Sequence, residues 1–93
     1  MANDLTGVSL WKLDTAGSIW TKGVRIAKLV LEPANAEDYA LIRVSDGGPL
    51  IAKLKAGADT SMVELDFPAG RLLPSFYLDS LSSGAVLWVY LWR

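Results

Sequence analysis

Hydrophobic residues recur at every second position along most of this chain, which is the spacing of β-strands rather than of helices. Neighbouring side chains of a strand point to opposite faces of its sheet, so a period of two gathers apolar side chains on one face. Runs of this kind occupy residues 8–13, 24–31, 39–44, 50–55, 61–67, 76–80 and 85–92. The pattern predicts about seven strands and no long amphipathic helix.

Segments rich in Gly, Pro, Asp and Ser separate these runs, at residues 14–18, 46–49, 55–60, 68–70 and 82–84. These residue types favour turns, and turns at this spacing are typical of antiparallel all-β folds. The 93 residues are enough for one small domain. We therefore predict a single all-β domain over residues 1–93, an antiparallel β-sandwich or a jelly-roll-like fold, with residues 1–6 as a short N-terminal arm.

The loop at residues 46–48 predicts the register of one hairpin. Apolar side chains of its two strands must share a face, and a slip of one residue would turn one strand's side chains over. A three-residue loop, Asp46-Gly47-Gly48, satisfies this condition because a glycine can take the left-handed position of such a turn. The expected pairing places Val44 opposite Leu50.

The run at residues 85–92 is apolar on both of its faces. Alternation places aliphatic side chains on one face and the aromatic side chains of Trp88, Tyr90 and Trp92 on the other. A two-layer sandwich buries only one face of each strand, so these aromatic residues need a further cover. The sequence predicts a protein interface at Trp88, Tyr90 and Trp92, and Trp11 and Trp20 are further candidates for it.

Two other interpretations of these aromatic residues stay open. In the first, the N-terminal segment folds back over the last strand within one chain. In the second, the tryptophans stack on sugar rings, as in a carbohydrate- or receptor-binding module. A sugar site also needs polar groups that fix the hydroxyls. The sequence neighbours of the tryptophans are mostly aliphatic, which favours core or subunit contact.

Composition restricts the possible chemistry. The chain has no cysteine and no histidine, which excludes disulfides, thiolate nucleophiles, the usual catalytic triads and the usual zinc sites. Glu64 and Asp66 lie two residues apart in a predicted strand and are the remaining acid–base pair. Alternating charge is, however, the ordinary outer surface of an antiparallel sheet. We expect no enzymatic activity, no cofactor and no metal ion.

The charge balance bears on the partners. Nine Lys and Arg residues against ten Asp and Glu residues give a net charge of −1, without the basic excess of a nucleic-acid-binding protein. The longest apolar run, at residues 85–92, is shorter than the ~20 residues of a membrane-spanning helix. The first residues lack the basic and apolar regions of a secretion signal. We expect no nucleic-acid or membrane partner and synthesis in the cytoplasm.

Three segments carry a resemblance to a known class of proteins: the strand at 24–31 with the polar loop after it, the Asp-Gly-Gly loop at 46–48, and the segment 78–84 leading into 85–91. In these the chain resembles small β-sandwich virion proteins of tailed bacteriophages. The resemblance implies a non-enzymatic structural protein of the virion, made in the host cytoplasm, that decorates or cements the capsid or lies in the tail. It also implies a homo-oligomer, often a trimer, with a major capsid or tail protein as partner.

Overall fold

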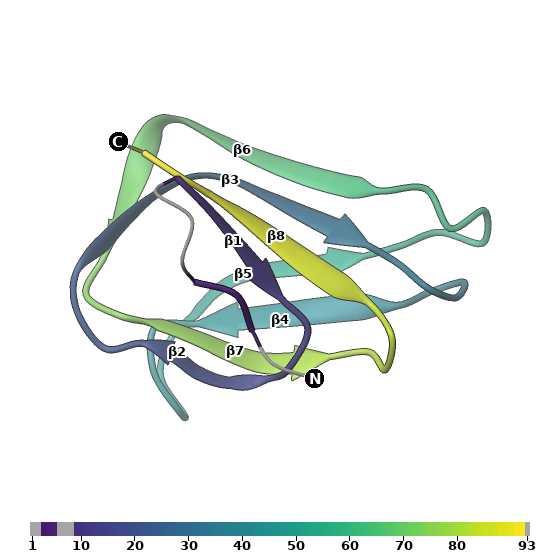
Figure 1. Cartoon of the computed structure of the whole chain (residues 1–93), viewed down its shortest axis with the longest axis horizontal. Coiled ribbons are helices and arrows are strands. Elements are labelled where there is room, and N and C mark those ends of the chain that lie inside the picture. The colour runs from purple at the N-terminus through teal and green to yellow at the C-terminus, as the bar shows by residue number, and fades with distance from the viewer. Residues whose placement is uncertain (1–2, 6–8, 93) are drawn as a thin grey trace.

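The computed structural model of the chain describes residues 3–5 and 9–92, and these form an all-β structure without a helix. Eight strands follow one another along the chain (Figure 1): β1 (Leu10–Leu13), β2 (Gly17–Trp20), β3 (Val24–Glu32), β4 (Tyr39–Arg43), β5 (Leu50–Lys55), β6 (Val63–Leu73), β7 (Phe76–Leu81) and β8 (Val86–Leu91). They form two four-stranded sheets, which we call sheet A (β1-β8-β3-β6) and sheet B (β2-β7-β4-β5). The prediction of an antiparallel all-β sandwich is confirmed.

The strands pair from the two ends of the sequence inwards. β1 pairs with β8, β2 with β7, β3 with β6 and β4 with β5, all antiparallel. The pairs of β3 with β8 and of β4 with β7 complete the sheets. This nested order is that of an eight-stranded jelly roll. As a consequence, β8 lies between β1 and β3 in the interior of sheet A.

The core lies between the inner faces of the two sheets. Sheet A contributes aliphatic side chains from β3 and β8, and sheet B contributes side chains from β4 and β7. Each of these side chains is at most 1% exposed: Ile26, Leu29, Leu31, Leu87, Val89, Ala40, Ile42, Phe76 and Leu78. Burial of one such large aliphatic side chain contributes about 1.5–3 kcal/mol. The apolar side chains that recur at every second position therefore form the contact that holds the two sheets together.

β2 is the strand that the hydrophobic pattern does not predict. Its first residues fall in the segment 14–18, where glycine and serine favour a turn over a strand. It is an edge strand that pairs with β7 alone, with an irregular register between Ser18 and Trp20. The buried side chain of Ile19 attaches it to the core. The strands therefore number eight, where the pattern gives about seven.

The segment 68–70, predicted to be a turn, does not end a strand, because β6 continues through it. The pairing of β6 with β3 shifts there, from Lys28 opposite Asp66 to Ile26 opposite Arg71. The proline of this segment is tolerated because β6 is an edge strand, where a missing N–H breaks no ladder. Its glycine adopts a φ of 74°. The turn-forming residues mark a bulge in β6.

The predicted register of the β4–β5 hairpin is confirmed from Tyr39 to Ile42 and wrong at the turn. Ala40 lies opposite Leu54, as the apolar pattern requires, and the pairing continues in the same register to Ile42. The register then shifts, so that Arg43 rather than Val44 lies opposite Leu50. The alternation of apolar residues predicts which side chains of each strand face the core, but it does not predict an irregular register next to the loop.

The N-terminal residues that the structure describes are attached to sheet A. Asp4 and Lys12 exchange two backbone hydrogen bonds, of 2.8 and 2.9 Å, alongside β1. The side-chain oxygen of Asn3 accepts hydrogen bonds from the backbone N–H groups of Asp14 and Thr15. Residues 3–5 of the predicted arm are therefore held against the domain, and the rest of it, residues 1–2 and 6, lies outside the described residues.

Candidate functional site

β8 has one buried face and one aromatic face, as its alternation predicts. Leu87 and Val89 are fully buried in the core, whereas Tyr90 is 41% and Trp92 46% exposed on the opposite side. Trp88, on the same outer side, is partly buried. We call the outer side of sheet A that carries Trp88, Tyr90 and Trp92 the aromatic face.

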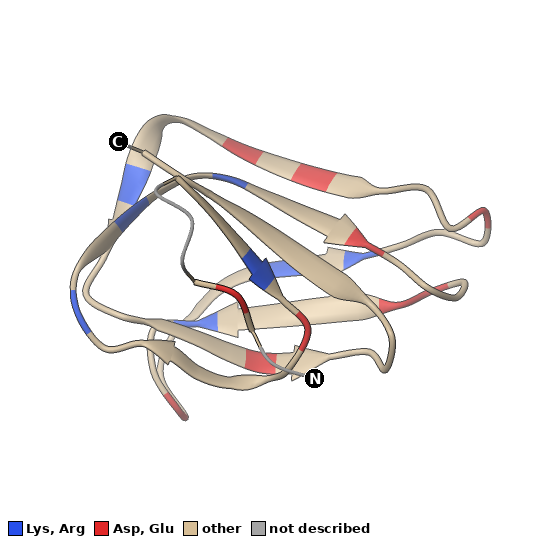
Figure 2. Cartoon of the chain, viewed as in Figure 1, with Lys and Arg blue, Asp and Glu red and all other residues tan. Residues whose placement is uncertain are grey.

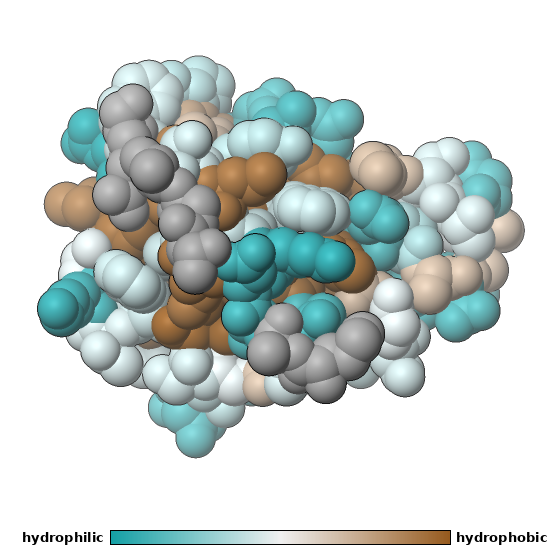
Figure 3. Space-filling model, viewed as in Figure 1, coloured by the Kyte–Doolittle hydropathy of each residue, from teal (hydrophilic) through white to brown (hydrophobic). Residues whose placement is uncertain are grey.

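The interior position of β8 puts these side chains in the middle of the aromatic face. Trp88 lies between Lys12 of β1 and Val30 of β3, because it is paired with both. β8 itself carries no charged residue, while its neighbouring strands do (Figure 2). Viewed from the same side, brown apolar side chains lie among pale and teal ones (Figure 3). Large side chains are thus exposed where an antiparallel sheet more often carries charged ones.

Residues 3–5, the N-terminal residues described before β1, do not cover the aromatic face. They run beside β1 at the edge of sheet A, and Leu5 packs against the core. Tyr90 and Trp92 keep the exposure given above with these residues in place. The cover by the chain's own N-terminus that the sequence left open is not formed by them.

Two lysines lie over aromatic rings of this face. The Nζ atom of Lys12 is 5.8 Å from the ring centroid of Trp88, and that of Lys28 is 5.7 Å from the ring centroid of Tyr90. Both distances are within the range of cation–π attraction. Lys28 also donates to the carboxylate of Glu64 on β6, and this bond raises the pKa of Lys28. The aromatic face is therefore bordered by fixed charges.

Trp88 is held by a polar contact as well. Its indole N–H donates a hydrogen bond of 3.0 Å to Oε1 of Glu32 at the end of β3. A partly buried indole N–H without a partner would oppose burial of the ring. The bond satisfies this group and fixes the orientation of the ring in the middle of the face.

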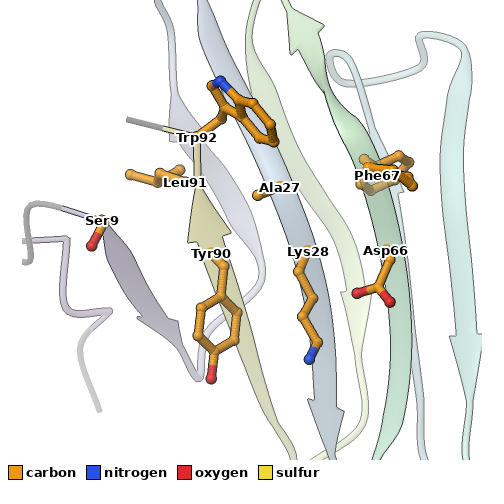
Figure 4. A pocket seen from close by; sticks show the side chains of 9 residues that line it. Ser9, Ala27, Lys28, Asp66, Phe67, Tyr90, Leu91 and Trp92 are labelled. Carbon is orange, nitrogen blue, oxygen red and sulfur yellow. The ribbon is translucent and has the colours of Figure 1, made fainter.

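A hollow of about 510 Å³ opens on the aromatic face beside Tyr90 and Trp92. In Figure 4, Trp92 leans over β3 towards Ala27, whose small side chain leaves space between Trp92 and Phe67 of β6. The bulge of β6 supplies Phe67 and Pro68 as the far wall. Lys28 and Asp66 complete its polar rim. The hollow thus combines two exposed aromatic side chains with a cation and an anion.

Trp11 lies in the core, which corrects its assignment to the interface. Its side chain is 1% exposed. The ring packs edge-on against Phe76 of sheet B, with the two centroids 5.9 Å apart and the ring planes at 87°. Since β1 belongs to sheet A, this indole fills space between the two sheets. A side chain buried in this way has no surface to offer a partner.

Trp20 lies on β2 in sheet B, so the structure does not bring it together with the aromatic residues of β8. Its ring centroid is 5.2 Å from that of Trp11, and it is partly buried by this contact. Its remaining surface lines a separate hollow of about 340 Å³ with Ser18 and Tyr77. Of the five predicted interface residues, Trp88, Tyr90 and Trp92 share one face.

Glu64 and Asp66 lie on the outer side of β6 and are exposed, as the alternation of that strand predicts. Glu64 is engaged by Lys28, and both carboxyl groups lie on an exposed strand face rather than in a closed cleft. Within residues 3–5 and 9–92, no three carboxylates come together as a metal-binding group. No helix among these residues is long and apolar enough to cross a bilayer.

The sequence pattern missed the polar and apolar neighbours that come from other strands. Lys28 lies next to Tyr90 through strand pairing, and Ala27 is the unpaired residue at the register shift beside it. Phe67 joins them because β6 bulges instead of turning. A proline and a glycine inside an otherwise alternating run were the available signal for that bulge.

Comparisons of the chain with protein-family models, with curated proteins and with solved structures find no match.

Proposed function

We propose that this protein is a non-enzymatic structural component of a bacteriophage virion, a capsid decoration or cement protein that binds a neighbouring protein through the aromatic face. The observation that carries the proposal is the exposure of Tyr90 on β8 and of Trp92 directly after it, at an interior strand of sheet A without a charged residue. Contact with another protein removes this surface from water. The docking energy then comes from aromatic burial.

The arrangement of the aromatic face supports this function. Aromatic residues are enriched at the centres of protein interfaces, where a few of them provide most of the binding energy. Trp88 is fixed by Glu32 and by Lys12, so this part of the face loses little side-chain freedom on binding. A charged rim around an apolar centre is the usual anatomy of such a contact.

The fold is compatible with a virion role and does not by itself decide the function. Eight-stranded jelly rolls occur in viral capsid proteins, and they also occur in lectins. The resemblance to small phage virion proteins favours the first of these. The proposal rests on that resemblance together with the exposed aromatic face.

The test is to band particles in caesium chloride from cells that produce the phage encoding this chain, and to search them for the chain by mass spectrometry. The chain is expected in the particles, and the double variant Tyr90→Ser, Trp92→Ser is expected to be depleted at least tenfold. Tyr39→Ser is the matched control, because Tyr39 is 40% exposed on the outer side of sheet B. Absence of the wild-type chain from the particles contradicts the virion role.

One observation favours a second candidate, a carbohydrate- or receptor-binding module. Along β8 the neighbours of the aromatic residues are apolar, but across the sheet Lys28 and Asp66 lie beside Tyr90 and Trp92 in the hollow. These are the polar groups that a sugar site requires. Tryptophan fluorescence during titration with glycans selected on a glycan array tests it. A saturable change that Asp66→Ala abolishes in a monomeric protein would favour this function over the structural one.

A further inference from the structure

We infer that the aromatic face is covered by a second copy of this chain, in a face-to-face pair whose twofold axis runs parallel to the strands between β8 and β3. The inference rests on the proposed function in one respect, that the aromatic face is a protein contact. It names the first partner of that face. The evidence is the order of the strands in sheet A and the charges that they carry.

Charge is distributed unequally across the aromatic face. The strand on one side, β1, carries Lys12, and the strand on the other side, β6, carries Glu64 and Asp66 ahead of its bulge and Arg71 after it. Figure 2 shows these strands with their blue and red segments. Between them lie β8, which carries no charged residue, and β3, whose Lys28 already contacts Glu64 of the same chain. Lys12 and the carboxylates of β6 lie at opposite edges of the face, so they can meet when a second copy is turned over onto it.

The register of sheet A defines which residues would meet. Lys12 is paired with Trp88, Trp88 with Val30, and Val30 with Glu64, so these four residues form one row across the sheet. Rotation about a twofold axis along the strands places β1 over β6 of the second copy and β8 over β3 of the second copy. The row keeps its position along the strands, so it meets the same row of the second copy. Lys12 then faces Glu64 of the second copy, and Trp88 lies above Val30 of the second copy, a side chain that is 6% exposed. Each contact occurs twice.

In the next row the same axis brings Tyr90 onto Lys28 and Leu10 onto Asp66, and the first of these contacts is complementary. Tyr90 and Lys28 are paired in one row, so Tyr90 of one copy faces Lys28 of the other, where a further cation–π contact forms. β8 of one copy lies over β3 of the other, which directs Trp92 towards the hollow beside Ala27 (Figure 4). A large side chain thus meets the space left by a small one.

The charges exclude the other way of turning the second copy over. A twofold axis perpendicular to the strands would place β6 of one copy on β6 of the other. Glu64 and Asp66 of the two copies would then meet, and like charges brought together at an interface oppose association.

The area of the aromatic face is sufficient for a weak dimer. Four strands at about 4.8 Å and six residues at about 3.3 Å give roughly 400 Å² in projection per copy. Because side chains stand out from this plane, the accessible area buried by two copies is on the order of 1,000 Å², near the lower limit for a specific interface. We expect a dissociation constant of about 100 μM.

Light scattering after size exclusion, with the loaded concentration varied from about 10 μM to about 1 mM, tests the pair. The expected mass rises from that of one chain to that of two. Lys12→Glu and Glu64→Lys should each weaken the dimer about tenfold, and the double variant should recover to within about threefold of the wild type. Lys53→Glu, on the outer side of sheet B, is the control and should leave the dimer unchanged.

A second measurement keeps the test decisive if a charge variant folds poorly. In a dilution series of the wild-type chain followed by ¹H–¹⁵N NMR, the amides of Ala27, Lys28 and Trp92 should shift with concentration, while those of β5 should not. A monomer at every concentration overturns the inference. So does a mass of three chains, or a dimer that neither single charge reversal weakens.

These results are separable from those of the particle experiment. A monomeric chain that is still found in particles, and lost from them when Tyr90 and Trp92 are replaced, overturns the pair and leaves the proposed function standing. A dimer that shows the charge recovery but is absent from particles overturns the virion role and leaves the pair standing.

Discussion

Trp88 and Glu32 are joined across sheet A by a hydrogen bond of 3.0 Å from the indole N–H to Oε1 of the carboxylate. The bond connects the outer side of β8 to the last residue of β3. It is the polar contact that holds an indole in the middle of the aromatic face. Its strength therefore affects both the stability of the fold and the rigidity of the docking surface.

The contribution of this bond can be measured by a double-mutant cycle. Trp88→Phe and Glu32→Ala each remove one partner, and the two changes together should cost about 1 kcal/mol less than the sum of the single changes. Glu32→Gln keeps an acceptor and should cost less than Glu32→Ala. Urea unfolding followed by circular dichroism gives the free energies. Strictly additive losses would show that the bond contributes nothing.

Asp38 should be the turn aspartate on which stability depends most. Asp38 is a buried residue, and its Oδ2 atom accepts hydrogen bonds of 2.9 Å from the backbone N–H groups of Ala34 and Asn35. Asp38→Ala leaves both donors without this acceptor and should cost about 2–3 kcal/mol of unfolding free energy. Asp46→Ala, in the exposed loop before β5, is the control and should change it by less than about 0.5 kcal/mol. Equal effects would contradict the role of Asp38.

Gly70 should tolerate a side chain less well than another glycine with a similar backbone. Gly70 and Gly47 have φ values of 74° and 76°, so alanine is strained at both. A Cβ atom at Gly70 would lie 2.8 Å from the side chain of Arg25 and 3.2 Å from Trp92, whereas at Gly47 it would meet nothing within 4 Å. Gly47→Ala should cost about 1 kcal/mol and Gly70→Ala about 1 kcal/mol more. Thermal unfolding measures the difference, and equal losses would show that Arg25 and Trp92 move aside freely.

The ion pair of Lys28 predicts a stability change at alkaline pH. The hydrogen bond from Lys28 to Glu64 raises the pKa of Lys28 above its ordinary value of 10.5. A raised pKa in the folded state means that the stabilisation is complete below pH 10.5 and is lost as the pH rises through the folded pKa. Glu64→Gln should return the pKa of Lys28 towards its ordinary value and flatten this decline. NMR titration of the lysine side chain measures the pKa directly, and a titration unaffected by Glu64→Gln would contradict it.

The parts of the fold that follow from local pattern could be predicted, and those that depend on distant pairing could not. The two faces of β8 follow from alternation alone, so Trp88, Tyr90 and Trp92 were found on one side of it. Trp11 also lies in an alternating run, but whether its indole meets the other sheet depends on Phe76, far away in the sequence. The hydrophobic period predicts to which face of its strand a side chain points. It does not predict which other part of the protein covers that face.

The bulge of β6 shows a second limit. Proline and glycine favour turns and usually end a strand, so their presence in the segment 68–70 predicts a turn. At the edge of a sheet the same residues are tolerated inside the strand, and edge position is a property of the whole topology. The hollow beside Ala27 depends on this bulge, and for that reason it could not be derived from the sequence.

The nested pairing of the strands has a consequence for how the protein is made. β8 is inserted between β1 and β3, yet it leaves the ribosome after the other seven strands. Until then β1 has no partner in sheet A, and the aliphatic residues of β3 face an incomplete layer. Contacts between segments so distant in sequence slow folding, because a long loop must close first. The nascent chain therefore exposes unpaired strand edges and apolar side chains until β8 is added, and its yield in cells should depend on chaperones.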